Sequence, residues 1–145
     1  MRSKNKGEVT VLVVKNNEEI SFLEVKYSPG KGRGVFAVAP IAEGICFESS
    51  PIIEISKKEI MLIRRSVIGD YFFWWGENKN RGAIALGYGS LYNHSYTPNA
   101  NFKLNLEEDT IEFYSLRPIS AGEEVTINYK GNPDSQSKVW FDAIE

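Results

Sequence analysis

Turn-forming residues interrupt this sequence so often that only short strands fit between them. Runs rich in β-branched and aromatic residues are bounded by Gly, Pro, Asn and Asp, a pattern typical of strands joined by tight turns. No alternation of strand and helix runs along the chain, so a parallel α/β sheet is not expected. We therefore predict a mainly β fold. The expected strands cover residues 8–14, 20–27, 35–39, 45–48, 83–86, 101–106 and 110–116.

Hairpins and two helices complete the expected architecture. Residues 8–27 predict an N-terminal β-hairpin, and residues 101–116 predict a second one. Ser56 and Glu59 have the spacing of a capping box, which predicts a short helix over residues 57–65 that Gly69 ends. Apolar residues also recur at helical spacing over residues 135–144, which indicates a closing helix.

Length and composition limit the class of protein. With 145 residues, the chain fits a single domain over residues 1–145. A net charge of −2 and a pI near 5.6 argue against nucleic-acid binding through phosphate contacts, which needs a strongly basic domain. One cysteine, Cys46, and one histidine, His94, exclude an internal disulfide and the usual zinc sites.

Targeting signals are also missing from the sequence pattern. No apolar run approaches the roughly 20 residues of a membrane span. The basic first residues lead into a strand-like run, so we see no secretory signal. A soluble protein inside the cell, in the cytoplasm or a host-cell nucleus, is the expectation.

Three glycines, Gly30, Gly32 and Gly34, form the first motif. A dinucleotide-binding fold would need a helix after them, but a strand-like run ending at Pro40 follows. The motif therefore indicates either a tight turn with positive φ or a bare backbone that a ligand can approach closely.

Two further segments hold chemically interesting side chains. Asn93 and His94 adjoin on a polar loop, where the histidine is either a structural residue or a group that contacts a cofactor; no neighbouring acid would orient it as a general base. Residues 122–129 form a turn and a short strand that ends on Tyr129, which is either a packing residue or a functional one. The aromatic run 71–75 belongs to the core or lines a channel for a cation.

Taken together, these segments resemble one family. Residues 32–37, 93–99 and 122–129 match, in order and in flanking residues, the motifs of the SET-domain lysine methyltransferases. The similarity covers about residues 20–145. It is greatest to the minimal viral SET proteins, and small bacterial ones are similarly short and lack cysteine-rich flanking segments.

The resemblance implies a SET fold of several small curved sheets around a pseudoknot, with one or two short helices. It also implies S-adenosylmethionine as methyl donor, S-adenosylhomocysteine as product, no metal, and a lysine of a protein, such as a histone tail, as acceptor. The small viral relatives suggest a homodimer. By position, the resemblance assigns the catalytic role to Tyr129, cofactor binding to Lys31, Gly32, Arg33, Gly34, Val35, Asn93, His94 and Trp140, and the substrate channel to Tyr71, Tyr88, Phe102 and Ile127.

Two departures from the family pattern affect these assignments. No cysteine follows Tyr129, so a zinc cluster is not expected there, and Trp140 either covers the adenine or packs a terminal helix. Ile127 stands where many relatives have Tyr or Phe, which favours di- or trimethylation. Lys130 replaces a common glycine.

Substrate recognition is predicted from two features. Acidic residues at 107–109 and 123–124 would attract a basic tail, and an edge strand near residues 83–89 would pair with an extended peptide. The alternatives are a SET-fold module that binds a peptide without turnover and an RNA-binding domain, which the acidic balance disfavours.

Overall fold

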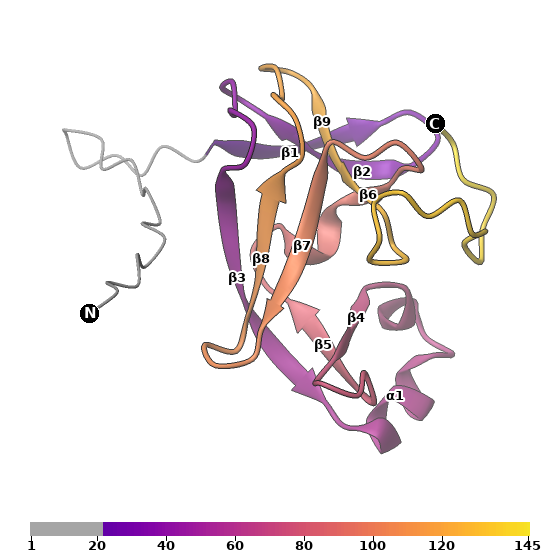
Figure 1. Ribbon diagram of the computed structural model, residues 1–145. Coiled ribbons are helices and arrows are strands. Elements are labelled where there is room, and N and C mark those ends of the chain that lie inside the picture. Colours follow the sequence, from indigo (N-terminus) through magenta and orange to yellow (C-terminus); the bar gives the residue numbers. More distant parts are fainter. Residues whose placement is uncertain (1–21) are drawn as a thin grey trace, which may run out of the picture.

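The computed structural model describes residues 22–145, in which two sheets and three short helices are arranged as Figure 1 shows. The strand order of the four-stranded sheet is β1 (Leu23–Ser28), β2 (Gly32–Ala37), β9 (Glu124–Ile127) and β6 (Asn93–His94). That of the five-stranded sheet is β4 (Phe72–Trp75), β5 (Arg81–Ala85), β3 (Cys46–Ile55), β8 (Thr110–Ser115) and β7 (Ala100–Asn105). The helices are α1 (Lys57–Ile63) and the 3-10 turns η1 (Val67–Asp70) and η2 (Gly89–Leu91). The mainly β prediction is confirmed.

The four-stranded sheet joins segments that are far apart in sequence. β1 and β2 pair antiparallel, from Leu23 opposite Ala37 to Ser28 opposite Gly32. The predicted hairpin over residues 8–27 lies largely outside the described residues, and within them β1 pairs forward with β2. β6 and β9 pair in parallel, with Asn93 opposite Thr126.

The five-stranded sheet is the larger layer. β7 and β8 form the predicted hairpin, with Ala100 opposite Ser115. β5 lies between β4 and β3. The predicted edge strand near residues 83–89 is therefore wrong, because the backbone of β5 is already paired on both sides; β4 and β7 are the edges of this sheet.

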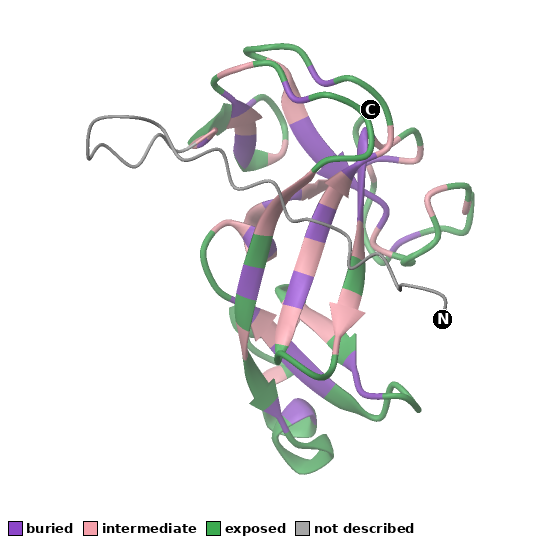
Figure 2. Ribbon diagram, turned by 60° about the vertical axis from the view of Figure 1, so that its left-hand side comes forward, coloured by how far each residue is buried: buried purple, intermediate pink, exposed green. Residues whose placement is uncertain are grey.

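The capping box predicts the start of α1 correctly. The Ser56 hydroxyl accepts from the Glu59 amide at 3.4 Å, and the Ser56 amide donates to the Glu59 carboxylate at 2.8 Å. Figure 2 shows α1 at the lower end of the view, mostly exposed, with Ile60 its one buried residue. The helix ends at Ile63 rather than at Gly69, which lies inside η1.

The core connects the two sheets. Burial alternates along β8, as a strand with one inward face requires. The buried hydrophobic cluster also includes residues of β9, so the strand that precedes Tyr129 is anchored in the core. Its buried members are Leu23, Val35, Ala37, Ile41, Trp75, Ala83, Ala85, Tyr92, Ala100, Ile111, Phe113, Ile119, Val125 and Ile127.

The closing helix predicted over residues 135–144 is wrong. The segment has no regular secondary structure and crosses the loop that follows β6. Some of its polar groups bond to that loop: the Val139 amide donates to the Tyr96 hydroxyl at 3.3 Å, and the carboxylate of the next residue after the segment, Glu145, accepts from the Tyr96 amide at 2.9 Å. Tertiary contacts thus override a local helical spacing.

Within residues 22–145, no helix is long and apolar enough to cross a membrane.

Candidate active site

Tyr129 lies where the two parallel strands β6 and β9 end. Its amide donates to Nδ1 of His94 at 3.2 Å, and its hydroxyl donates to the main-chain oxygen of Tyr92 at 2.8 Å. The strand pairing supports this arrangement through the Ser95 amide, which donates to the Ile127 oxygen at 3.0 Å. Both ends of the tyrosine are therefore held by the histidine segment, and the phenol has a fixed direction.

Asn99 also holds the 122–129 segment in place. Its side chain is buried and accepts from the Thr126 amide at 2.9 Å. Its amide nitrogen donates to the main-chain oxygen of Glu124 at 2.7 Å and to the carboxylate of Glu123 at 2.9 Å. One asparagine thus satisfies three polar groups of the 122–129 segment, which explains why an amide suits the position after Pro98.

The glycine motif completes the junction. Asn93 donates from Nδ2 to the Arg33 oxygen at 2.9 Å and to the Glu124 carboxylate at 2.7 Å. Ser28 donates to the second oxygen of that carboxylate at 2.9 Å. Gly30 and Gly32 have φ of 77° and 84°, as the turn interpretation requires. The three motif segments therefore meet in space.

His94 acts here as a structural acceptor. The side chain is only 3% exposed, and because Nδ1 accepts from the Tyr129 amide, the neutral ring carries its proton on Nε2. Burial lowers the pKa of His94, and the nearby Lys31 and Lys130 lower it further against the opposing effect of Glu145. Among the described residues, Nε2 has no hydrogen-bond partner. The buried N–H is thus a donor available to a ligand.

The first of two cavities opens beside His94. Its volume is about 430 Å³, within the range of small-molecule sites. Aromatic side chains of the C-terminal segment form one wall, and the basic residues of the glycine turn form another. The lining residues are Gly30, Lys31, Arg33, Asp70, Tyr71, Ser90, Leu91, Asn93, His94, Tyr129, Trp140, Phe141, Asp142 and Ile144.

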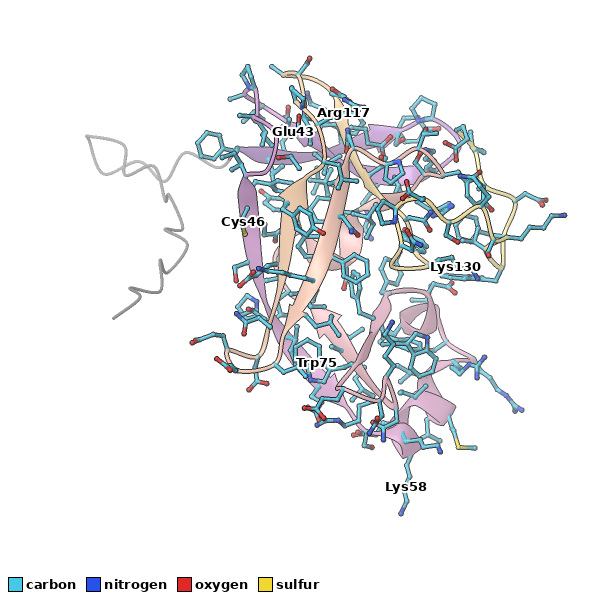
Figure 3. All side chains as sticks on the ribbon, in the orientation of Figure 1. Glu43, Cys46, Lys58, Trp75, Arg117 and Lys130 are labelled. Atoms are coloured by element: carbon cyan, nitrogen blue, oxygen red, sulfur yellow. The ribbon has the colours of Figure 1, made fainter. Side chains whose placement is uncertain are left out.

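The second cavity also has Tyr129 in its wall and has a volume of about 560 Å³. Figure 3 shows Lys130, one of its residues, between the C-terminal segment and the part of the molecule that holds β4 and α1. Its walls are mainly aromatic and basic. The residues are Arg64, Gly69, Asp70, Tyr71, Phe72, Phe73, Trp74, Lys79, Gly89, Ser90, Tyr92, Phe102, Lys103, Leu104, Tyr129, Lys130, Gly131 and Trp140.

Both cavities share part of their walls. Tyr129, Tyr71 and Trp140 line each of them, together with Asp70 and Ser90. The Trp140 indole stacks on the Tyr129 ring, with centroids 5.8 Å apart and an interplanar angle of 22°. The phenol of Tyr129 is therefore at the boundary where a ligand from one cavity would meet a ligand from the other.

The Tyr129 phenol is protonated at neutral pH. Burial raises the pKa of Tyr129 to about 12, with smaller contributions from Tyr71, Glu124 and Asp70. A phenol with this pKa, already donating to a carbonyl, is not a general base at pH 7. Its chemistry here is that of a fixed dipole and a hydrogen-bonding oxygen.

The sequence-predicted site residues divide into three groups. Lys31, Arg33, Asn93 and His94 line the first cavity, Phe102 lines the second, and Tyr71, Tyr129 and Trp140 line both. Gly32, Gly34 and Val35 belong to β2, outside both linings, and Val35 is fully buried.

The predicted channel residues Tyr88 and Ile127 lie in neither cavity wall. Their surroundings explain why. Tyr88 turns away and donates from its hydroxyl to the Leu23 oxygen at 3.1 Å. Ile127 is 1% exposed and belongs to the core.

The acidic residues expected to attract a basic tail lie outside the walls of both cavities. Glu123 forms an ion pair with Arg117 at 2.6 Å, and Glu124 accepts from Asn93 and Ser28. Residues 107–109 form the β7–β8 turn, which Figure 1 shows at the lower left, away from the C-terminal segment. None of these carboxylates lines either cavity, so attraction of a basic tail by them stays a prediction.

Sequence reasoning missed several residues of the site. Asp70, Phe73 and Phe141 line the cavities, and Phe141 contacts the rings of Tyr129 and His94 at 6.0 and 6.2 Å between centroids. Phe73 belongs to the aromatic run that was expected in the core or a channel. Asp70 had no signal beyond its place next to Tyr71.

Comparison with known proteins places this site in a family. Residues 32–130 match the SET domain. The chain belongs to the SET-domain family of protein-lysine methyltransferases, which confirms the expected fold.

A curated relative from Schizosaccharomyces pombe, a histone-lysine N-methyltransferase described as specific for H3 lysine-37, is 36% identical over 121 residues. The match spans 83% of this chain and 77% of that protein.

Solved structures agree with this fold. A Plasmodium falciparum protein described as a candidate histone methyltransferase superposes with a TM-score of 0.63 at 29% identity, covering 75% of this chain and 93% of the other. A chain of an apo PRC2 complex superposes with a TM-score of 0.64 at 24% identity, covering 74% of this chain and 15% of its own, and shows the fold alone.

Proposed function

We propose that the protein transfers the methyl group of S-adenosylmethionine to the side-chain nitrogen of a lysine in a protein, with histones as the substrate class. The observation that carries this proposal is the wall shared by the two cavities at Tyr129. A donor in the first cavity and a lysine in the second would meet at that phenol. The S. pombe relative supports histones as the substrate class.

The first cavity fits the donor. S-adenosylmethionine combines a carboxylate, an adenine and a sulfonium that supplies an electrophilic methyl group. Lys31 and Arg33 offer cations for the carboxylate, and the orphaned Nε2–H of His94 offers a buried donor. Trp140 presents an indole that is 62% exposed, on which the adenine would stack. We assign these residues, with Asn93, to cofactor binding.

The second cavity suits a lysine side chain that must lose its proton. A lysine ammonium has an ordinary pKa near 10.4 and cannot act as a nucleophile. Aromatic walls formed by Tyr71, Phe73 and Phe102 disfavour the charged form and lower that pKa. Phe73 and Phe102 contact each other edge to face at 4.9 Å between centroids, so the two rings form one continuous part of this wall.

Tyr129 contributes orientation. Its oxygen is fixed by the Tyr92 carbonyl, so it can hold one geometry at the boundary of the two cavities. Holding two reacting groups in line removes about 7–11 kcal/mol of barrier in favourable cases. This role requires the phenol to stay neutral, in agreement with its raised pKa.

Two experiments test the function. Isothermal titration with S-adenosylmethionine should give one site per chain. Incubation with methyl-labelled donor and core histones should label lysine, identified by mass spectrometry of the digested product. Cofactor binding without label on any protein, in histones or in cell extract, would instead support the non-catalytic peptide-binding alternative.

Three further properties accompany the proposal as predictions: a homodimer, suggested by the family resemblance, and a location inside the cell and no direct contact with nucleic acid or membrane, suggested by the composition of the sequence. Light scattering of the purified protein tests the first. Titration with duplex DNA and with lipid vesicles tests the last.

A further inference from the structure

Asp70 is an unpaired carboxylate at the boundary of the two cavities. It is the last residue of η1, it is exposed, and its side chain lines both cavities next to Tyr71. Over residues 22–145, none of the ion pairs or side-chain hydrogen bonds involves this carboxylate. Within the described residues, this carboxylate is therefore free to contact a ligand.

The negative charge of Asp70 differs in sign from the other charges of the second cavity. The other ionisable groups with full charge that line the second cavity are all basic: Arg64, Lys79, Lys103 and Lys130. Lys103 is neutralised by Glu112 at 2.9 Å, but no ion pair within the described chain neutralises the other three. A cationic side chain entering this cavity would thus be repelled everywhere except near Asp70.

The position of Asp70 relative to Tyr129 adds a second observation. Asp70 is among the charges that raise the pKa of the Tyr129 phenol, so its field reaches the boundary of the cavities. The aromatic rings of Tyr71 and Trp74 flank the same wall and attract a cation through their faces. A carboxylate beside aromatic rings is a common way to bind an alkylammonium group.

We propose that Asp70 captures the ammonium of the substrate lysine at the boundary of the two cavities and so selects lysine as the acceptor. The inference rests on the proposed function, because it assigns the second cavity to the lysine. Asp70 is a specificity residue, and no proton transfer is assigned to it. Capture by charge strengthens binding of the cationic form, and the aromatic walls of the second cavity favour loss of the proton before transfer.

A small probe tests this step without any need for methyl transfer. The full chain, saturated with S-adenosylhomocysteine, is titrated by NMR with n-butylammonium and separately with 1-butanol, a neutral molecule of similar length. Asp70→Asn should weaken binding of the cation about threefold to fivefold, as expected for an exposed charge pair, and leave binding of the alcohol unchanged. Asp70→Glu should retain most of the preference.

Glu77→Gln is the matched control, because Glu77 is an exposed carboxylate in the β4–β5 turn that lines neither cavity. It should change neither affinity. The proposal is overturned if the wild-type protein binds butylammonium no better than butanol, or if Asp70→Asn weakens both ligands equally or neither of them.

Kinetics with core histones provide a second readout. Asp70→Asn should raise KM with kcat within about twofold of wild type, because a capture residue acts on binding of the substrate. A lower kcat with unchanged KM would overturn the proposal. If the wild-type protein transfers no label to histones, that result refutes the proposed substrate class, while the butylammonium titration still decides the role of Asp70.

Discussion

Gly34 lies directly beneath the carboxylate of Glu124. A Cβ built at Gly34 would collide with Oε1 of Glu124 and come within 3.0 Å of Nδ2 of Asn93. That carboxylate joins three segments of the site, since it accepts from Asn93 and from Ser28. The third glycine of the motif is thus required by close packing, whereas Gly30 and Gly32 are required by their positive φ.

Gly34→Ala should lower the free energy of unfolding by about 1–3 kcal/mol, because the new methyl group displaces the Glu124 side chain. Removing that side chain should relieve the collision, so Gly34→Ala should cost clearly less in a Glu124→Ala background. Urea unfolding of the single and double variants measures this coupling. Gly32→Ala is the control: its φ of 84° is strained but its surroundings are open, so its cost should be the same in both backgrounds. Strictly additive costs for Gly34 and Glu124 would contradict the packing account.

Trp140→Ala should weaken binding of S-adenosylhomocysteine about tenfold, since stacking of a base on an aromatic ring contributes about 1–3 kcal/mol. Titration calorimetry measures the effect. Tyr27→Ala removes an aromatic ring that is 75% exposed on β1 and lines neither cavity, so it should leave the affinity unchanged. An affinity within about twofold of wild type in Trp140→Ala would exclude stacking on the indole.

The lowered pKa of Glu123 predicts a loss of folding stability in acid. Burial alone would raise the pKa of Glu123, but hydrogen bonds from Arg117, the Ser120 amide and Asn99 outweigh it and lower the pKa from 4.5 to about 2. The folded state therefore favours the carboxylate, and the stability it contributes is present above pH 4.5 and is lost as the pH falls toward 2.

Wild-type protein should lose on the order of 2 kcal/mol more than Glu123→Gln between pH 5 and pH 2.5, because the amide has no proton to bind. Urea unfolding at a series of pH values gives both curves. Parallel curves for the two proteins would show that Glu123 does not supply this stability.

The number of methyl groups is a further prediction. Ile127 stands where many relatives have Tyr or Phe, and it brings no hydroxyl that could hold a water beside the lysine nitrogen and so limit methylation to one group. Mass spectrometry of long incubations should find di- and trimethyllysine. Monomethyllysine as the only product, with unused donor still present, would refute it.

Local signals in the sequence predicted local structure well. The capping box of Ser56 and Glu59 and the β7–β8 hairpin depend on residues near each other, and both are observed. The apolar spacing of Val139, Trp140 and Ile144 was misleading because these residues contact partners distant in sequence. Trp140 packs on Tyr129, and Ile144 fills the space above Gly30.

Long-range features needed more than local patterns. The parallel pairing of Asn93 with Thr126 has no local sequence signature and was expected only through the family motifs. The roles that those motifs assign stay predictions. Packing turns two of the assigned side chains, Tyr88 and Ile127, away from the cavities. Asp70 belongs to an exposed 3-10 turn. In the sequence alone, a carboxylate that lines a cavity looks the same as an ordinary surface carboxylate.

The most direct test is single-turnover methyl transfer by wild-type protein and by Tyr129→Phe, with S-adenosylhomocysteine affinity measured in parallel. The substitution removes the hydroxyl that the Tyr92 carbonyl fixes and leaves the ring on which Trp140 stacks. We expect the transfer rate to fall at least ~100-fold, the size typical for loss of a group that acts in the transition state, with cofactor affinity nearly unchanged. A wild-type rate in Tyr129→Phe would contradict the claim that the two cavities meet at a functional phenol.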